Sequence, residues 1–227
     1  MKKAIVLSSG GLDSSTCLFI AKSKGYQLYA LSFDYGQRHK KELDCSKDVC
    51  NYAGVVEHRI LTLPTPKGSA LTEDIEVPTG RNLEDMSVVI PVTYVPARNT
   101  VFIALALQYA EEVNADAIYI GVTAIDYSGY PDDRPEYIRA WQDLINLATK
   151  KTVEGETVDL CTPLLQLYKS EIIDWGIELG VPYNLTTSCY SGREKACGVC
   201  DSCILRLKGF REAGKIDPLF YETDMNR

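Results

Sequence analysis

The first sixty residues alternate between short apolar runs and helical patterns, and this alternation constrains the fold more than any other feature. Residues 3–7, 27–33 and 56–61 are short runs dominated by apolar side chains, which is typical of strands buried in a sheet. Amphipathic helical patterns at 16–24 and 40–53 separate these runs, and a glycine follows each of them. The order strand, helix, strand, helix, strand predicts a doubly wound, mostly parallel α/β sheet.

The rest of the chain extends this pattern. Further helices are expected at 100–113, 135–149 and 169–179, and further strands at 117–122 and 158–162, which gives a five-stranded sheet. A segment rich in proline and glycine, 64–91, interrupts the pattern without periodicity of its own. We expect an ATP-binding α/β domain at 1–183 that contains this insertion, followed by a helical, cysteine-rich region at 184–227.

Charge and apolar content exclude several classes of protein. The 227-residue chain has 24 basic and 31 acidic residues, a net charge of −7, which argues against nucleic acid as its main partner. No apolar run approaches the ~20 residues that span a bilayer, and polar Ser8 ends the first run too early for a signal peptide. We therefore expect a cytoplasmic location, where the eight cysteines would serve metal binding or catalysis rather than disulfides.

The segment SSGGLDSS, residues 8–15, connects the first strand to the first helix. Gly10 and Gly11 permit positive φ angles, so that several backbone N–H groups can converge on one anion. The start of the helix adds the positive end of its dipole, and the serines add hydroxyl donors. Asp13 would orient the loop or bind Mg²⁺. The segment predicts a phosphate site, and the structural alternative is a simple turn capped by serines.

Four cysteines gather within fifteen residues near the end of the chain. Cys189, Cys197, Cys200 and Cys203 follow the spacing C-x7-C-x2-C-x2-C. Four thiolates without an open coordination position suit a structural zinc ion, with an iron–sulfur cluster as the alternative. The other four cysteines fall within expected helices and strands, where they are interpreted as small core residues.

The string SGGLDS directly after a strand resembles the pyrophosphate-binding loop of the ATP pyrophosphatase (PP-loop, adenine nucleotide α-hydrolase-like) superfamily. The resemblance implies that the chain binds ATP, releases pyrophosphate and adenylates an oxygen of its substrate. The nucleotide contacts implied in this way are Leu7, Ser8, Ser9, Gly10, Gly11, Leu12, Asp13, Ser14, Ser15, Thr16 and Cys17.

Further segments narrow the resemblance to one family. DYGQRH at 34–39, VPARNT at 95–100, DYSGYPDDRP at 126–135 and the cysteine segment at 188–205 resemble the 7-cyano-7-deazaguanine synthase family of queuosine precursor biosynthesis. Asp133 departs from the family pattern, which has cysteine there, but it lies outside both the glycine loop and the cysteine cluster in the sequence.

The family resemblance implies a ligase reaction. ATP would drive the conversion of 7-carboxy-7-deazaguanine and ammonia to the 7-cyano product through adenylated carboxylate and amide intermediates, releasing AMP and pyrophosphate. It further implies ATP, Mg²⁺, one structural Zn²⁺ per chain and a homodimer, with no nucleic-acid or membrane partner. The alternatives are a tRNA sulfurtransferase with the same loop, another adenylating amide ligase, or a module that binds nucleotide without releasing pyrophosphate.

Several side chains are candidates for the reaction. Arg98 and Lys169 are cations placed where strand ends should converge, and with Asp13 they form the expected catalytic group. His39 follows the carboxyl end of a strand and is a candidate for contact with the substrate; a solvated helix start is the alternative. Candidates for the deazaguanine ring, by stacking or by accepting N–H groups, are Asp126, Tyr127, Ser128 and Tyr130, although a plain turn would explain the same residues.

Overall fold

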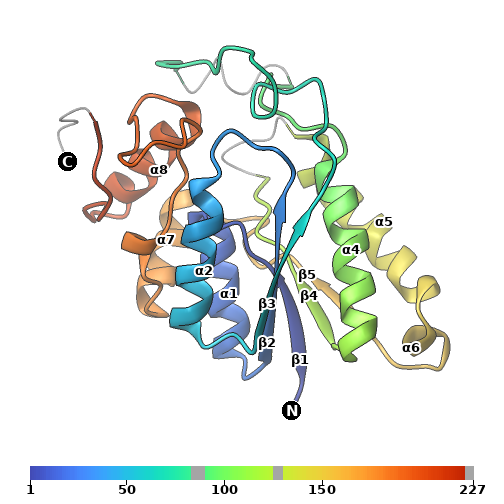
Figure 1. Cartoon of the computed structure of the whole chain (residues 1–227). Coiled ribbons are helices and arrows are strands. Elements are labelled where there is room, and N and C mark those ends of the chain that lie inside the picture. The colour runs from blue at the N-terminus through green and yellow to red at the C-terminus, as the bar shows by residue number, and fades with distance from the viewer. Residues whose placement is uncertain (83–89, 125–129, 223–227) are drawn as a thin grey trace.

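Five parallel strands form one sheet at the centre of the protein (Figure 1). The structure is a computed structural model that describes residues 1–82, 90–124 and 130–222. The sheet has the order β3-β2-β1-β4-β5, with β1 in the middle. Its strands are β1 (Lys3–Leu7), β2 (Gln27–Asp34), β3 (Glu57–Thr62), β4 (Ala117–Tyr119) and β5 (Asp159–Cys161). The predicted doubly wound parallel sheet is confirmed.

Helices cover both faces of the sheet. The helices are α1 (Leu12–Ser23), α2 (Lys41–Ala53), α4 (Arg98–Val113), α5 (Pro135–Ala148), α6 (Lys150–Val153), α7 (Lys169–Glu178) and α8 (Asp201–Glu212), with 3₁₀ turns at Pro131–Asp133 and Tyr183–Leu185. Helices α1, α2 and α7 lie on one side of the sheet and α4 and α5 on the other (Figure 1). Parallel strands joined through helices require such coverage, because both faces of the sheet are apolar.

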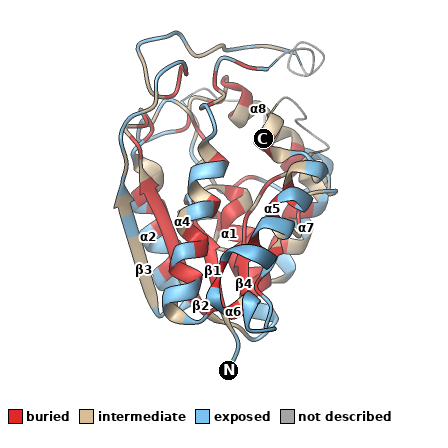
Figure 2. Cartoon of the chain, turned by 90° about the vertical axis from the view of Figure 1, so that its right-hand side faces the viewer, coloured by how far each residue is buried: buried red, intermediate tan, exposed pale blue. Residues whose placement is uncertain are grey.

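The alternation of side chains along β1 divides the core into two layers. Ala4 and Val6 pack into the layer beneath α1, α2 and α7, whereas Ile5 and Leu7 pack into the layer beneath α4 and α5. All four side chains are at most 6 % exposed. Figure 2 shows β1, β2 and β4 largely buried, the edge strand β3 partly exposed, and the outward faces of the helices exposed. The central strand is therefore fixed from both sides, and the segment that follows it starts from a rigid support.

Two boundaries differ by three residues or more from the expected ones, and the others by at most two. Helix α1 begins at Leu12 rather than at 16, so the loop before it is shorter than expected. Strand β4 ends at Tyr119 rather than at 122. Beyond it the chain crosses close over the glycine loop, where a Cβ on Gly121 would lie 3.0 Å from the carbonyl carbon of Asp13 and the nitrogen of Ser14.

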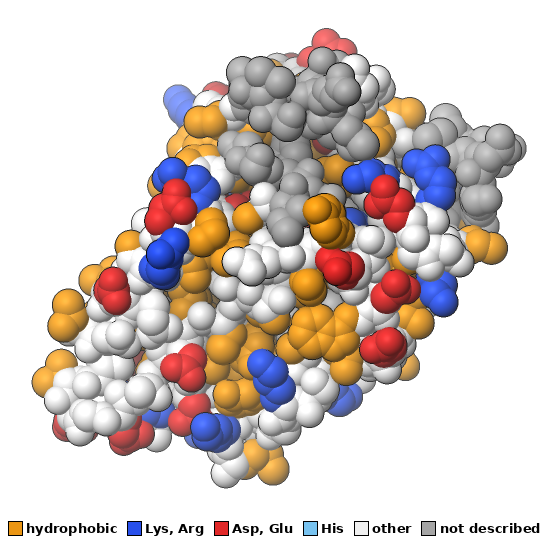
Figure 3. All heavy atoms as spheres, turned by 180° about the vertical axis from the view of Figure 1, so that it is seen from behind, with side chains coloured by type: hydrophobic (Ala, Val, Ile, Leu, Met, Phe, Trp, Pro, Cys, Tyr) orange, Lys and Arg blue, Asp and Glu red, His pale blue; other side chains and the backbone are white. Residues whose placement is uncertain are grey.

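The C-terminal region is helical, as expected, and it shares the core of the sheet domain. Phe210 of α8 packs in the same apolar layer as Val181 and Tyr183. The domain boundary expected between residues 183 and 184 stays a prediction. On the face behind that of Figure 1, basic side chains are interspersed with acidic and apolar ones (Figure 3). Among the described residues, no helix combines the length and apolar character needed to cross a membrane.

Candidate active site

The glycine loop has a fixed shape of its own. The Ser14 hydroxyl lies 3.0 Å from the Ser9 hydroxyl and accepts a hydrogen bond from the Ser9 backbone N–H at 3.1 Å. Gly10 has φ +79°, and a Cβ there would collide with the backbone of Glu42 and lie 2.6 Å from the nitrogen of Ser46. Glycine is required for both reasons. The loop is thus held in place by its own serines and by the close approach of α2.

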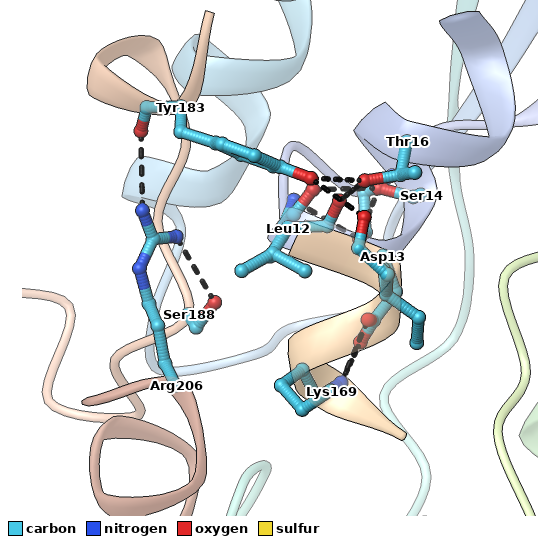
Figure 4. A network of polar contacts seen from close by, with 11 residues as sticks. Leu12, Asp13, Ser14, Thr16, Lys169, Tyr183, Ser188 and Arg206 are labelled. Atoms are coloured by element: carbon cyan, nitrogen blue, oxygen red, sulfur yellow. Dashed lines mark hydrogen bonds and ion pairs between the residues drawn. The ribbon is translucent and has the colours of Figure 1, made fainter. Parts of the chain in front are cut away.

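The loop ends at the start of α1, beside an ion pair. Gly11 precedes α1 with extended backbone, and no side chain caps the helix. The first backbone N–H groups of α1 are therefore available to an anion. Asp13 accepts two hydrogen bonds from Nζ of Lys169, at 2.7 and 2.9 Å (Figure 4). A Cβ on Gly209 of α8 would lie 2.9 Å from Cβ of Lys169, so the lysine stem packs tightly against α8. The lysine is thereby held next to the loop.

A cavity of about 290 Å³ opens at the carboxyl ends of the strands. The sheet order reverses beside β1, and in open parallel sheets ligands bind at such a switch point. Four candidates from outside the glycine loop line it together: His39, Arg98, Tyr130 and Lys169. Segments far apart in the sequence therefore meet the loop in one cavity.

The eleven expected nucleotide contacts divide into two groups. Seven line the cavity: Leu7, Ser8, Ser9, Gly11, Leu12, Asp13 and Ser14. Gly10 packs behind the loop against α2, and Ser15 and Thr16 are buried in α1, where the hydroxyl of Thr16 lies 2.8 Å from that of Tyr183. Cys17 belongs to the apolar core. Of the expected ring contacts, Asp126, Tyr127 and Ser128 lie outside the described residues.

The wall opposite the loop contains a carboxyl that sequence reasoning set aside. Asp133 lines the cavity together with Arg98, and its Oδ1 accepts a hydrogen bond of 2.9 Å from Asn99 Nδ2. Burial, with the neighbouring Asp132, raises the pKa of Asp133 to about 7, although Arg98 opposes the shift. Arg98 itself follows Ala97, which has a left-handed backbone at φ +52°. The departure from the family pattern therefore lies in the site, which its sequence position did not indicate.

Sequence reasoning also missed Arg206, a buried cation of α8 that lines the cavity. Its guanidinium is paired with Asp217, with Nε–Oδ2 at 2.7 Å, and donates at 2.8 Å to the hydroxyl of Thr186. It also donates to the carbonyl of Tyr183 (Figure 4). The next residue, Thr187, donates its N–H to the carbonyl of Gly10 at 2.9 Å. The C-terminal region thus supports the glycine loop. Arg206 stands between two leucines in the sequence, and no local pattern distinguishes it from a surface residue.

The four clustered cysteines come together as predicted. Their sulfur atoms all lie within 4.8 Å of one another, and three of the four residues are buried. Backbone N–H groups of Ser191 and Cys197 point at the sulfur of Cys189, and neighbouring thiols donate hydrogen bonds that hold the pKa of Cys189 below its usual value. Four thiolates this close would repel one another without a cation. A closed set of four sulfur donors fits zinc.

A five-stranded parallel sheet with a serine- and glycine-rich loop after its central strand defines an α/β protein with the adenine nucleotide α-hydrolase-like fold. The family model described as "Queuosine biosynthesis protein QueC" matches residues 3–214, and the chain belongs to this family. The resemblance drawn from the motifs is thus confirmed.

Curated relatives agree with this assignment, and a solved structure has a similar fold. The chain is 56 % identical over 222 residues to the 7-cyano-7-deazaguanine synthase of Acetivibrio thermocellus, covering 97 % of this chain and 98 % of that one. It is 57 % identical over 225 residues to the enzyme of the same name from Desulfatibacillum aliphaticivorans, covering 97 % of each. The structure of NMN synthetase from Francisella tularensis is similar in fold, with a TM-score of 0.51 and 16 % identity over 95 % of this chain and 78 % of that one.

Proposed function

We propose that the chain uses ATP to convert 7-carboxy-7-deazaguanine and ammonia into 7-cyano-7-deazaguanine in the cavity beside the glycine loop. As a member of the QueC family it is a 7-cyano-7-deazaguanine synthase, an enzyme of queuosine biosynthesis. The observation that supports the site most strongly is the preformed loop of Ser9, Gly10 and Ser14, which opens into the cavity at the switch point of the sheet.

The chemistry explains why ATP is needed. A carboxylate is a poor electrophile, because its leaving group would be oxide. Attack of the carboxylate on the α-phosphate releases pyrophosphate and leaves an acyl-adenylate, from which ammonia displaces AMP to give the amide. A second adenylation, on the amide oxygen, lets AMP leave as the nitrile forms. Negative charge accumulates on the phosphates in both adenylations, so fixed donors and cations supply most of the rate enhancement.

The loop and its cations match these requirements. Backbone N–H groups of the loop and of the first turn of α1 would bind the pyrophosphate portion, with Mg²⁺ arriving on ATP. Lys169 would neutralise phosphate charge. Of the two roles considered for Asp13, the structure favours orientation, since both carboxylate oxygens hold Lys169. Arg98 lines the same cavity and would neutralise charge from the opposite wall.

The substrate ring and the zinc ion have separate places in this proposal. Tyr130, whose hydroxyl lies 3.0 Å from that of Thr93, is the described candidate for stacking on the deazaguanine ring. Cys189, Cys197, Cys200 and Cys203 would hold one zinc ion, which stabilises the C-terminal fold and takes no part in the reaction. A homodimer and a cytoplasmic location remain predictions.

The decisive experiment is an assay with defined substrates. The protein is incubated with Mg-ATP, ammonium and 7-carboxy-7-deazaguanine, and AMP, pyrophosphate and the nitrile are followed by mass spectrometry. The expected stoichiometry is two AMP per nitrile, with the amide as an intermediate. Binding of ATP without AMP formation by zinc-loaded, folded protein would contradict the proposal, and a thiolated product would favour the sulfurtransferase alternative.

A further inference from the structure

His39 is held by a carboxylate that is itself fixed. The residue is only 6 % exposed, and both His39 and Glu42 line the cavity. Nε2 of His39 lies 3.2 Å from Oε2 of Glu42. The other oxygen of Glu42 accepts a hydrogen bond of 2.9 Å from Gln37, whose amide is bound in turn to the backbone of Phe33 and Tyr35. The carboxylate therefore has one orientation toward the imidazole.

This contact decides which nitrogen carries the proton. An ionised carboxylate can only accept, so in the neutral imidazole the proton lies on Nε2 and the lone pair on Nδ1. Nδ1 is buried and has no hydrogen-bond partner among the residues that the structure describes. Buried polar atoms in folded proteins are almost always paired. An unpaired acceptor on a residue of the cavity wall is therefore suited to receive a proton or an N–H group from a bound ligand.

The segment that contains His39 and Glu42 also packs against the glycine loop. The backbone of Glu42 is in contact with Gly10, so the start of α2 is packed directly against the loop. A second segment packs against His39. The ring centroid of Tyr190 lies 5.9 Å from that of His39, and a Cβ on Gly192 would lie 2.8 Å from the Cα of His39. The facing titratable groups are thus the carboxylate of Glu42 and the phenol of Tyr190. The ring of His39 is therefore held between the start of α2 and the segment that contains Tyr190 and Gly192.

We infer that His39 is the proton acceptor for ammonia in amide formation, and that Glu42 is the positioning residue that fixes its tautomer. This inference rests on the proposed function. The nitrogen of ammonia forms a bond to the acyl carbon, and the bond from that carbon to the adenylate oxygen breaks, with AMP leaving with the electron pair. The proton that the nitrogen loses passes to Nδ1 of His39. Adenylation itself needs no such acceptor.

Two substitutions separate this role from a structural one. His39→Gln keeps an N–H for Glu42 and removes the second nitrogen. In Glu42→Gln, the new side-chain carbonyl still accepts the hydrogen bond from Gln37. The new NH₂ group faces Nε2 of His39, so Nε2 has to accept a hydrogen bond. The imidazole proton therefore moves to Nδ1. The neighbouring exposed Lys40, whose partner is Asp34, supplies the control substitution Lys40→Gln.

The tautomer can be measured without an activity assay. The chain has two histidines, so ¹⁵N-histidine labelling gives two imidazole spectra, and His39→Gln assigns them. We expect an Nε2–H tautomer for His39 in the unsubstituted protein and in Lys40→Gln, and an Nδ1–H tautomer in Glu42→Gln. An unchanged tautomer in Glu42→Gln would overturn the positioning role.

The two half-reactions then test the proton transfer. ATP–pyrophosphate exchange with 7-carboxy-7-deazaguanine, in the absence of ammonium, reports adenylation. We expect His39→Gln and Glu42→Gln to keep exchange within about threefold and to lose amide formation by roughly 100-fold or more, the usual range for a missing acid–base group. A parallel loss of both half-reactions, or amide formation that survives, would overturn the inference. Absence of exchange in the unsubstituted protein would instead contradict the proposed function.

Discussion

The glycine loop and the cysteine cluster both present a binding site, but they are held together in different ways. The loop follows the central strand, lies between helices, and is braced by its own serines, by α2 and by Thr187. Ala196 is the only buried residue of the cluster that is not a cysteine among the described part of the chain, and Val77, Tyr190 and Tyr221 pack against it partly buried. Contacts within the protein fix the shape of the loop, whereas we expect the cluster to need a metal ion in order to be stable.

The largest effect is expected at the cluster. Cys200→Ser should remove the zinc and roughly 5 kcal/mol or more of folding free energy, since structural zinc contributes ~10–16 kcal/mol in isolated peptides. Metal analysis and chemical denaturation measure both. Cys161→Ser, on β5 and outside the cluster, is the control and should retain one zinc per chain. Equal zinc content in both variants would remove the contrast between the two regions.

Arg206 connects the two regions and should have the next largest effect. Arg206 and Asp217 are each 2 % exposed at their side chains, so Arg206→Met leaves a buried carboxylate without its partner, at a cost of about 3–5 kcal/mol. The double variant Arg206→Met, Asp217→Leu should regain part of this loss, because the unpaired charge is gone. Urea denaturation measures all three proteins. If the double variant is no more stable than the single one, the charge pair is not the cause.

Gly10 in the loop and Gly54 after α2 form a matched pair of glycines. Gly10 and Gly54 have φ +79° and +77°, but a Cβ on Gly54 meets nothing within 4 Å. Gly54→Ala should therefore cost only the backbone strain, about 1–2 kcal/mol. Gly10→Ala should cost roughly 1–3 kcal/mol more, because α2 must move, and it should weaken ATP binding. Denaturation and nucleotide titration compare them; equal stability and affinity in the two variants would show that the loop is not tightly packed against α2.

A pH-dependent effect is expected at the cavity wall. Burial raises the pKa of Asp133 to about 7, so between its unfolded pKa near 4 and pH 7 the folded protein binds more protons than the unfolded chain. Its contribution therefore makes stability fall as pH rises through this range. Asp133→Asn should remove this dependence, so that its stability relative to the unsubstituted protein rises by up to about 4 kcal/mol between pH 4 and pH 8, at ~1.4 kcal/mol per pKa unit. A constant difference across that range would contradict the raised pKa.

The sequence predicted what depends on local pattern. The strands, the sheet class, the glycine loop and the four-cysteine cluster follow from periodicity, glycine placement and spacing, and each is present. The residues of the cavity wall could not be predicted in this way, because the cavity is assembled from segments that are distant in the chain. Arg206 has no local signature, and Glu42 shows only the spacing of three residues from His39. Asp133 looked peripheral by its position in the sequence, and only the fold brings it beside Arg98.

The hydrogen bond from Thr187 to Gly10 joins the beginning of the chain to its end. During synthesis the glycine loop leaves the ribosome well before its support, which includes Arg206 of α8. A nascent chain can therefore pair β1 with β2 long before the loop is secured. The loop would reach its supported shape only after α8 has been made and has packed behind it.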